Sequence, residues 1–443
     1  MAKVGIVSLG CPRNLVDSEV MVGSLKRAGF ELTDIENGVD ICLVNTCSFI
    51  DSAREESIDA ILQAASLKRD GKIRHMVVAG CLAQLGKKEL LKDIPEIDLL
   101  IGTNDFHRIG ELVKGLGHGV SCAVSRKLDH LYTEDSPRSL LTPKHYAYVK
   151  IAEGCDNSCS YCIISRLRGS FRSRPMASIA GEIKRLSAGG DLREIDLIAQ
   201  DTTLFGRDRP GKETLPALLR TICRMRTSVG WIRLLYTHPA HYSDDLIDTI
   251  AHEGKICKYL DIPVQHVSDS ILKRMNRHTT KKAIIGLLEK IRKNVRGVTL
   301  RTSIITGFPG ETEEEFRELI DFVKRMRFER LGVFIYSRED GTRAAGFRGQ
   351  VPEKVKMERY DELMKTQKAI SAELNRSFLG ETIKVLVDEK ISGEKDRFLG
   401  RSEGDAPEVD GAVYITGKGL RVGDFCRVRI TDTLEYDLVG ESV

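Results

Sequence analysis

The chain has 443 residues, of which 41% are hydrophobic and 30% are charged, and its formal net charge is +4. This length predicts two or three domains, and the composition is that of a soluble globular protein. No apolar run is long enough to span a membrane and no signal peptide begins the chain, so we expect a cytoplasmic protein without a membrane partner, and we take it to be a monomer. Its 11 cysteines therefore favour metal binding over a disulfide framework.

Residues 1–118 are predicted to form a doubly wound α/β domain, because apolar runs alternate with helix patterns. Short, largely β-branched runs of the kind found in buried parallel strands occur at residues 4–9, 41–45, 76–79 and 99–101. Cys11, Cys47 and Cys81 follow the first three of these strands. The carboxyl ends of parallel strands meet at one sheet edge, so the three cysteines are expected to converge. Any single cysteine is commonly a buried structural residue, but three equivalent positions predict a three-cysteine cluster site.

Residues 141–372 continue the alternation of strands and helices. Six strand patterns occur at residues 146–151, 194–199, 231–236, 259–264, 300–305 and 331–336. Six βα units predict a partial, open TIM-like barrel whose functional loops lie at the carboxyl ends of its strands. The remaining five cysteines have no partner at ligand spacing and are interpreted as packing residues: Cys42, Cys122, Cys223, Cys257 and Cys426.

The first loop of this predicted barrel carries Cys155, Cys159 and Cys162 in the pattern CxxxCxxC. A 4Fe–4S cluster normally takes four thiolates, so three at close spacing leave one iron open unless a fourth ligand comes from elsewhere. Zinc is the alternative. Zinc sites usually combine two CxxC units, or one such unit with histidines, and no second unit lies nearby. The spacing therefore favours an iron–sulfur cluster with an open iron.

Polar residues follow several of the predicted core strands. Gly307 and Gly310 allow close approach of the backbone to a ligand, although the same turn is common between a strand and a helix. His238 and His266 are candidates for acid–base chemistry, but a lone histidine is more often a structural hydrogen-bonding residue, and no catalytic residue is assigned. The basic run 166–174 fits the steering of an anionic partner and a solvated turn equally well.

The C-terminal part changes character. Residues 353–377 are predicted to form a long amphipathic linker helix, and residues 376–443 a small all-β barrel. Its strand patterns lie at residues 382–387, 413–415 and 425–430. This segment holds ten Lys and Arg against fourteen Asp and Glu, a net charge of −4. Modules that grip RNA are usually basic, so the charge favours a basic protein partner.

The CxxxCxxC loop, with Tyr161 before its last cysteine, resembles the radical S-adenosylmethionine (SAM) superfamily. With the strand-end cysteines and the final barrel, the whole chain resembles the methylthiotransferases, which have an N-terminal cluster domain, a radical SAM core and a C-terminal TRAM barrel. Residues 8–18, 261–266 and 405–411 resemble the RimO-type branch, which methylthiolates the β-carbon of an aspartate in ribosomal protein S-twelve. The MiaB-type branch, which modifies an adenosine of transfer RNA and typically has PVQSG where this chain reads PVQH, is the alternative.

The resemblance implies two 4Fe–4S clusters and two molecules of SAM. Cys155, Cys159 and Cys162 are implied to hold the cluster that binds SAM, and Cys11, Cys47 and Cys81 the cluster that holds the inserted sulfur. It further implies contacts to SAM from Tyr161, Gln200, Gly307, Pro309, Gly310 and Glu311. The implied partners are S-twelve or the small ribosomal subunit, an electron donor such as flavodoxin, and a sulfur source. A non-enzymatic iron–sulfur electron carrier is a further alternative, but it leaves the large open barrel unexplained.

Overall fold

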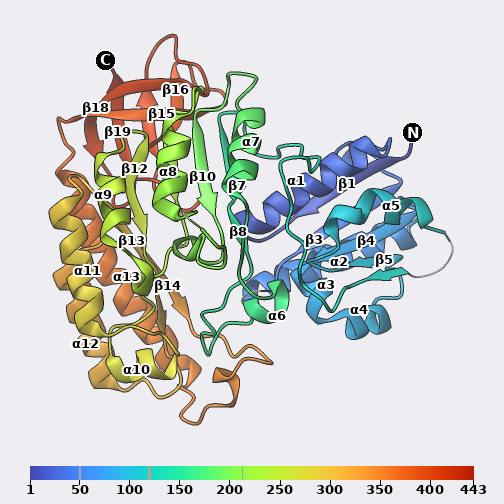
Figure 1. The fold of residues 1–443 in the computed structure, drawn as a ribbon, viewed down its shortest axis with the longest axis horizontal. Coiled ribbons are helices and arrows are strands. Elements are labelled where there is room, and N and C mark those ends of the chain that lie inside the picture. The colour runs from blue at the N-terminus through green and yellow to red at the C-terminus, as the bar shows by residue number, and fades with distance from the viewer. Residues whose placement is uncertain (49–50, 118–120, 212) are drawn as a thin grey trace.

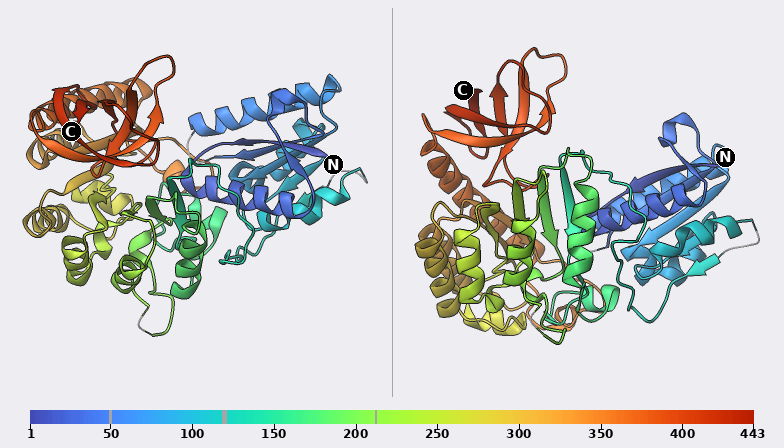
Figure 2. Two further views of the ribbon diagram at one scale, coloured as in Figure 1. Left: turned by 90° about the horizontal axis from the view of Figure 1, so that it is seen from above. Right: turned by 45° about the horizontal axis from the view of Figure 1, so that its top comes forward.

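The structure is a computed structural model, and it describes residues 1–48, 51–117, 121–211 and 213–443. Two six-stranded sheets and a small closed barrel follow one another along the chain. The first sheet lies beside the second, and the closed barrel lies over one end of the second (Figure 1). Two further views confirm that the first sheet and the closed barrel lie against different parts of the central sheet (Figure 2). No helix among the described residues is long and apolar enough to cross a membrane.

The first sheet is parallel throughout, with the strand order β2-β1-β3-β4-β5-β6. All four predicted strands are present, and the sheet adds β2 and β6, which are too short to give a sequence pattern. Its last strand lies beyond residue 118, where the sequence placed the end of this domain. The strands are β1 (Lys3–Ser8), β2 (Glu31–Leu32), β3 (Ile41–Thr46), β4 (His75–Gly80), β5 (Leu99–Ile101) and β6 (Ser121–Ala123).

Alternate side chains of this sheet pack on helices at its two faces. Leu43 and Val77 join a core with residues of α1, whereas Val44 and Val78 join a core with Ile61 of α2. All six residues of β3 are buried, as expected for a parallel sheet covered on both faces. The helices are α1 (Pro12–Arg27), α2 (Asp51–Arg69), α3 (Cys81–Leu85), α4 (Lys87–Asp93) and α5 (Ile109–Leu112).

The central sheet is a partial barrel with the order β14-β13-β12-β11-β10-β7, in which every pair of neighbours is parallel. All six predicted strands are present, and β12 begins three residues earlier than predicted. The strands are β7 (Tyr146–Lys150), β10 (Glu194–Ile198), β11 (Trp231–Leu234), β12 (Ile256–Asp261), β13 (Thr299–Thr306) and β14 (Arg330–Ile335). A separate antiparallel pair, β8 (Ala152–Glu153) and β9 (Arg172–Ser173), closes the loop that carries CxxxCxxC.

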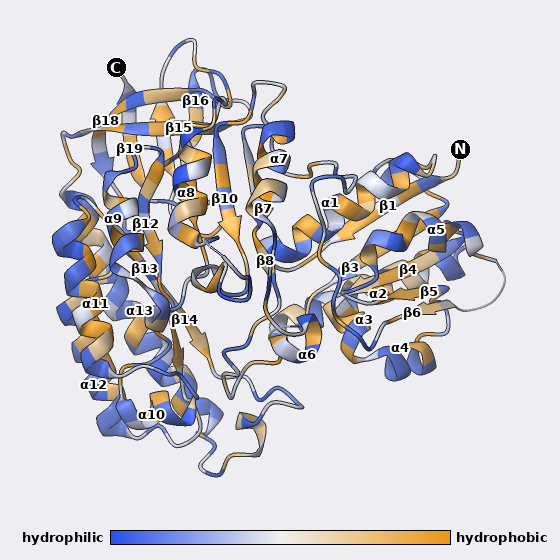
Figure 3. Cartoon of the chain, viewed as in Figure 1, coloured by the Kyte–Doolittle hydropathy of each residue, from blue (hydrophilic) through white to orange (hydrophobic). Residues whose placement is uncertain are grey.

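Amphipathic helices cover the outside of this partial barrel, and their outer faces are hydrophilic (Figure 3). The last helix packs on β14 and on the neighbouring helix α12, so it belongs to the core and is not the linker that the sequence suggested. The helices are α6 (Ile164–Arg168), α7 (Met176–Leu186), α8 (Leu215–Arg224), α9 (Asp244–His252), α10 (Asp269–Arg274), α11 (Lys281–Asn294), α12 (Glu313–Met326) and α13 (Glu353–Arg376).

The closed C-terminal barrel has the order β15-β16-β17-β19-β18. It docks on the amino ends of the core strands, where Trp231 of β11 meets Phe425 with ring centroids 4.8 Å apart. The sequence missed β16 and β19, because glycines interrupt both apolar patterns. The strands are β15 (Thr382–Lys390), β16 (Arg397–Ser402), β17 (Val413–Thr416), β18 (Phe425–Thr433) and β19 (Leu438–Ser442).

Candidate active site

The first three predicted ligands follow neighbouring strands, as expected. Cys11, Cys47 and Cys81 come after β1, β3 and β4, which are adjacent and parallel. Gly10 has a φ of +92°, and a Cβ on it would lie 3.0 Å from Cys47 Sγ. Burial raises the pKa of Cys81 to about 11, and the nearby thiols of Cys47 and Cys11 add to the rise. Three soft donors at one sheet edge fit a thiolate-bound cluster.

The second three predicted ligands lie on one tight loop between β8 and α6. The Cys155 N–H donates to the Gly169 carbonyl at 3.1 Å, and the Cys162 N–H donates to the Cys159 carbonyl at 3.1 Å. Burial raises the pKa of Cys155 to about 11 and that of Cys162 to about 12, and neighbouring cysteines contribute to both shifts. Such thiols are protonated in the absence of metal and lose their protons when a metal binds.

One cavity of about 570 Å³ connects the two cysteine sets. The first cysteine set is Cys11, Cys47 and Cys81, and the second cysteine set is Cys155, Cys159 and Cys162. The cavity wall contains Cys11 of the first set and all three cysteines of the second. Seven non-glycine residues of the described chain have positive φ, and three of them line this cavity: Tyr236, Gln265 and Glu408. Strained backbone of this kind persists where the surrounding structure holds it, and it gathers at functional sites.

Guanidinium groups lie against both cysteine sets. Arg168 of α6 reaches across to the first set, where its Nη2 lies 3.8 Å from Cys81 Sγ. Arg277 Nη1 lies 3.9 Å from Cys159 Sγ of the second set. Although burial opposes the charged form of Cys11, Arg13 outweighs it and lowers the pKa of that thiol. The sequence analysis did not assign these arginines to the cysteines, because Arg168 and Arg277 lie 87 and 118 positions from Cys81 and Cys159.

A buried ion network joins the first domain to the core. Arg168 donates to Asp17 Oδ2 at 2.6 Å, and Lys150 donates to Asp17 Oδ1 at 2.5 Å and to Glu153 Oε2 at 2.7 Å. Arg174, also fully buried, pairs with Glu182. Both interpretations of the basic run 166–174 are therefore wrong for Arg168 and Arg174. These two side chains are buried, so they face neither solvent nor a partner molecule.

Only part of the predicted SAM-binding set lies on the cavity. Tyr161 and Gln200 line it, whereas the turn formed by Gly307, Pro309, Gly310 and Glu311 packs outside it. Within that turn, Glu311 accepts the Gly307 N–H at 2.7 Å and pairs with Arg359 at 2.9 Å, and burial raises the pKa of Glu311 to about 7. The contribution of this turn to SAM binding stays a prediction.

The two histidines considered for acid–base chemistry have structural contacts. His238 Nδ1 accepts the Ala240 N–H at 3.2 Å, and burial lowers the pKa of His238 to about 2. His266 Nδ1 accepts the Ser268 N–H at 3.0 Å. Both side chains therefore fix turns after core strands. Of the five cysteines assigned to packing, Cys42 and Cys257 are buried, but Cys122 is exposed and that interpretation is wrong for it.

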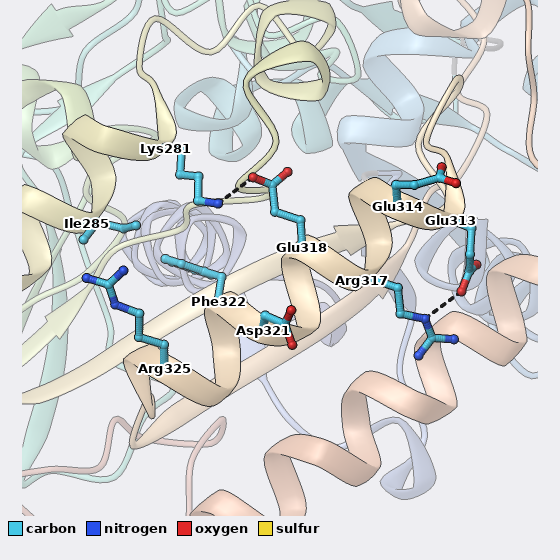
Figure 4. A pocket seen from close by; sticks show the side chains of 9 residues that line it. All are labelled: Lys281, Ile285, Glu313, Glu314, Arg317, Glu318, Asp321, Phe322 and Arg325. Carbon is cyan, nitrogen blue, oxygen red and sulfur yellow. Dashed lines mark hydrogen bonds and ion pairs between the residues drawn. The ribbon is translucent and has the colours of Figure 1, made fainter.

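The C-terminal barrel contributes directly to the cavity. Its loop 403–410 enters the amino end of the partial barrel, where Glu408 and Val409 reach the cavity wall. Asp410 in this loop accepts the Tyr259 hydroxyl at 2.6 Å and lies 3.3 Å from Arg301 Nε. A second hollow, on the outer surface between α11 and α12, is lined mainly by charged side chains such as the Lys281–Glu318 ion pair and holds no thiol (Figure 4).

Comparison with known proteins identifies three family segments. Residues 3–102 match Uncharacterized protein family UPF0004, residues 149–323 the radical SAM superfamily, and residues 379–443 the TRAM domain. "Ribosomal protein uS12 methylthiotransferase RimO" of Geobacter sulfurreducens is 49% identical over 443 residues, which cover 100% of this chain and 98% of the relative. The chain belongs to the RimO family of methylthiotransferases. The RimO protein of Pelotomaculum thermopropionicum is 48% identical over 100% of this chain and 99% of its own.

Solved structures support the fold of this RimO family member. The radical SAM methyltransferase TsrM from Kitasatospora setae aligns with a TM-score of 0.53 at 14% identity, over 75% of this chain and 73% of that one. The cobalamin-dependent SAM radical enzyme OxsB aligns with a TM-score of 0.53 at 14% identity, over 84% of this chain and 56% of that one. At such low identity these likenesses establish the architecture alone.

Proposed function

We propose that this chain is a radical SAM methylthiotransferase that places a methylthio group on the β-carbon of an aspartate in ribosomal protein uS12, the protein named S-twelve above. The observation that carries the proposal is that one cavity is lined by Cys11, from the three cysteines at the edge of the first sheet, and by all three cysteines of the CxxxCxxC loop. The names of full-length relatives at 46–49% identity support the same activity and disfavour transfer RNA as the substrate.

The cysteines present fit two clusters. Cys155, Cys159 and Cys162 would hold one 4Fe–4S cluster and, at its open iron, SAM, while Cys11, Cys47 and Cys81 would hold the other. When bound, these groups supply the one-electron cleavage of SAM, the inserted sulfur and the methyl group. A flavodoxin-type electron donor, a separate sulfur source, a monomeric state and SAM contacts from the turn 307–311 belong to the same proposal.

The protein's own residues fix the geometry between the two sets. The network of Asp17, Lys150, Glu153 and Arg168 holds the first domain on the core, and its charges are fully desolvated. Buried pairs of this kind are strongly destabilised when one partner is removed, so they favour one relative position. Loop 403–410 closes the amino end of the partial barrel, which keeps water from reaching the cavity by that route.

The proposed activity is tested by incubating reconstituted enzyme with SAM, a reductant and either uS12 or transfer RNA. Mass analysis of both substrates is expected to show one added methylthio group on an aspartate of uS12 and none on the RNA. Modification of the RNA alone would overturn the proposal.

The two cysteine sets are expected to load independently. Reconstituted wild-type protein should carry about eight irons, four for each cluster. Cys159→Ala should lose half of the iron and all cleavage of SAM. Cys47→Ala should also lose half of the iron but still cleave SAM to 5′-deoxyadenosine without modifying uS12. A wild-type content near four irons would contradict the assignment of two clusters.

A further inference from the structure

Arg13 is a partly buried arginine with an unusual set of contacts. It lies in the first turn of α1, two residues after Cys11, and its side chain lines the cavity. Its Nη1 donates to the Ala199 carbonyl at 3.3 Å, and its Cζ lies 4.4 Å from the centroid of the Tyr236 ring. Across residues 1–48, 51–117, 121–211 and 213–443, no carboxylate comes within ion-pair distance of this guanidinium.

Several buried arginines around the core have a carboxylate partner. Examples are Arg168 with Asp17, Arg233 with Glu194 and Arg359 with Glu311. Removing a guanidinium from water is costly unless an anion compensates its charge. Arg277, also on the cavity wall, lacks a carboxylate too, but its two ends are held by the Pro263 carbonyl and Cys159 Sγ.

The Arg13 guanidinium has more N–H donors than its described contacts use. A guanidinium offers five N–H groups in a planar fork. One of them is given to the Ala199 carbonyl, and the group also stabilises the thiolate of Cys11. The remaining donors are available to a molecule in the cavity, and a carboxylate matches the fork in charge and geometry.

The position of Arg13 matches the place where a target carboxylate must lie. Arg13 lines the cavity together with Cys11 of the first set and all three cysteines of the second, so it borders the gap between the two sets. Under the proposed function, the β-carbon of the target aspartate must be accessible from both sets. The side-chain carboxylate is one C–C bond from that carbon, about 1.5 Å, and therefore occupies the same gap.

We propose that Arg13 binds the side-chain carboxylate of the target aspartate and makes the enzyme selective for an acidic residue. This inference rests on the proposed function and adds a binding site for the reacting side chain. Arg13 acts as a positioning residue, because it holds the β-carbon in the gap and takes no part in bond making.

The test compares substrate selectivity in cluster-loaded enzyme. Wild type, Arg13→Gln and Arg13→Lys are assayed with uS12 and with uS12 whose target aspartate is replaced by asparagine. Arg27→Gln, at the exposed end of the same helix, is the matched control. Binding of both uS12 forms is measured with SAM but without reductant, so that this readout does not depend on turnover. Iron per chain is determined for each variant.

Arg13→Gln is expected to weaken binding of the aspartate form by roughly 10- to 100-fold, the loss typical of a hydrogen bond to a charged group. Binding of the asparagine form should change little, so the preference for aspartate disappears. Arg13→Lys should retain most of the preference, because it keeps the charge, and Arg27→Gln should behave as wild type.

Two results would overturn the inference. One is a wild-type preference for aspartate in Arg13→Gln at normal iron content. The other is loss of iron in Arg13→Gln, which would assign the residue to the first cysteine set and not to the substrate. If wild type modifies neither form of uS12, the proposed function itself fails, and this outcome is visible before any variant is compared.

Discussion

Single residues decide how closely the chain can approach the first cysteine set. Gly10 precedes Cys11 and runs against Cys47, so a Cβ at this position would lie 2.7 Å from Cys47 Cβ. The positive φ of Gly10 is also one that side chains adopt only with strain. Both constraints favour glycine at position 10, where the backbone turns immediately before the predicted ligand Cys11.

Gly10→Ala is expected to remove the iron of the first set, about half of the total, because the new methyl group displaces Cys47. Gly29→Ala is the matched control, since Gly29 has the same φ of +92° but no atom within 4 Å of a Cβ. The control should keep its iron and lose only about 1 kcal/mol of stability from backbone strain. Equal iron content in the two variants would show that crowding at Gly10 is unimportant.

The cysteines could be found from the sequence, whereas their arginines could not. Each cysteine of the first set follows a recognisable buried strand, and parallel topology places strand ends together. Arg168, in contrast, lies 151 positions from its partner Asp17, and no local pattern links them. The basic run containing Arg168 looked like a solvated turn, because burial of charge depends on partners that only the tertiary fold supplies.

Strand β10 carries two buried acids, Glu194 and Asp196, whose pKa values are shifted in opposite directions. Glu194 pairs with Arg233 at 2.8 Å and with Arg401 of the C-terminal barrel at 2.7 Å. Burial opposes ionisation of Glu194, but the two arginines outweigh it and lower the pKa of this carboxyl. Burial and the charge of Glu194 raise the pKa of Asp196 well above its usual value. One strand therefore holds two buried acids, two residues apart, whose pKa values are shifted in opposite directions.

Asp196→Asn is expected to raise the melting temperature at alkaline pH. An acid with a raised folded-state pKa loses stability as pH rises from its ordinary pKa of 3.8 toward the raised value. Asparagine avoids this loss, so its advantage over wild type should grow as pH rises above the ordinary pKa of 3.8. Glu194→Gln, which leaves Arg233 and Arg401 without an anion, should lower the melting temperature. An Asp196→Asn advantage that shrinks with increasing pH would contradict this assignment.

The strands that the sequence analysis missed are either very short or interrupted by glycine. The strands β2 and β6 have two and three residues, too few to show a period, and β16 and β19 contain glycines. The sequence also did not reveal which acids of the final barrel have partners in the core. Three of its acids, Asp388, Asp405 and Asp410, pair with His145, Arg330 and Arg301 of the core, so part of this charge faces the core.

Across the whole molecule, the C-terminal barrel is a structural part of the core. Its loop 403–410 fills the amino end of the partial barrel, with Arg330 paired to Asp405 at 2.6 Å and Arg233 bonded to the Glu403 carbonyl at 2.8 Å. Removing the barrel would leave Arg330 without its carboxylate partner and Arg233 without one of its hydrogen bonds. It cannot be treated as a detachable module for substrate docking.

Asp410→Asn is expected to destabilise the protein by roughly 1.5–3 kcal/mol, because it weakens the hydrogen bond from Tyr259 and removes one of the two carboxylates at Arg301, whose other partner Asp261 remains. Hydrogen exchange at the amino ends of β12 and β13 should increase, since the loop holds them through Tyr259 and Arg301. Asp432→Asn, on an exposed part of β18, is the control and should change neither quantity. Unchanged exchange in Asp410→Asn would show that the loop does not hold the core strands.

The ion network between the first domain and the core has a consequence for the order of synthesis. Helix α1 buries Asp17 and Glu19, and their cationic partners Arg138, Lys150 and Arg168 lie 119 to 151 positions further along the chain. While a ribosome has translated only the first domain, these carboxylates have no cation, and burying them is unfavourable. The set Cys11, Cys47 and Cys81 must therefore wait for residues 138–168 before its side of the sheet can pack.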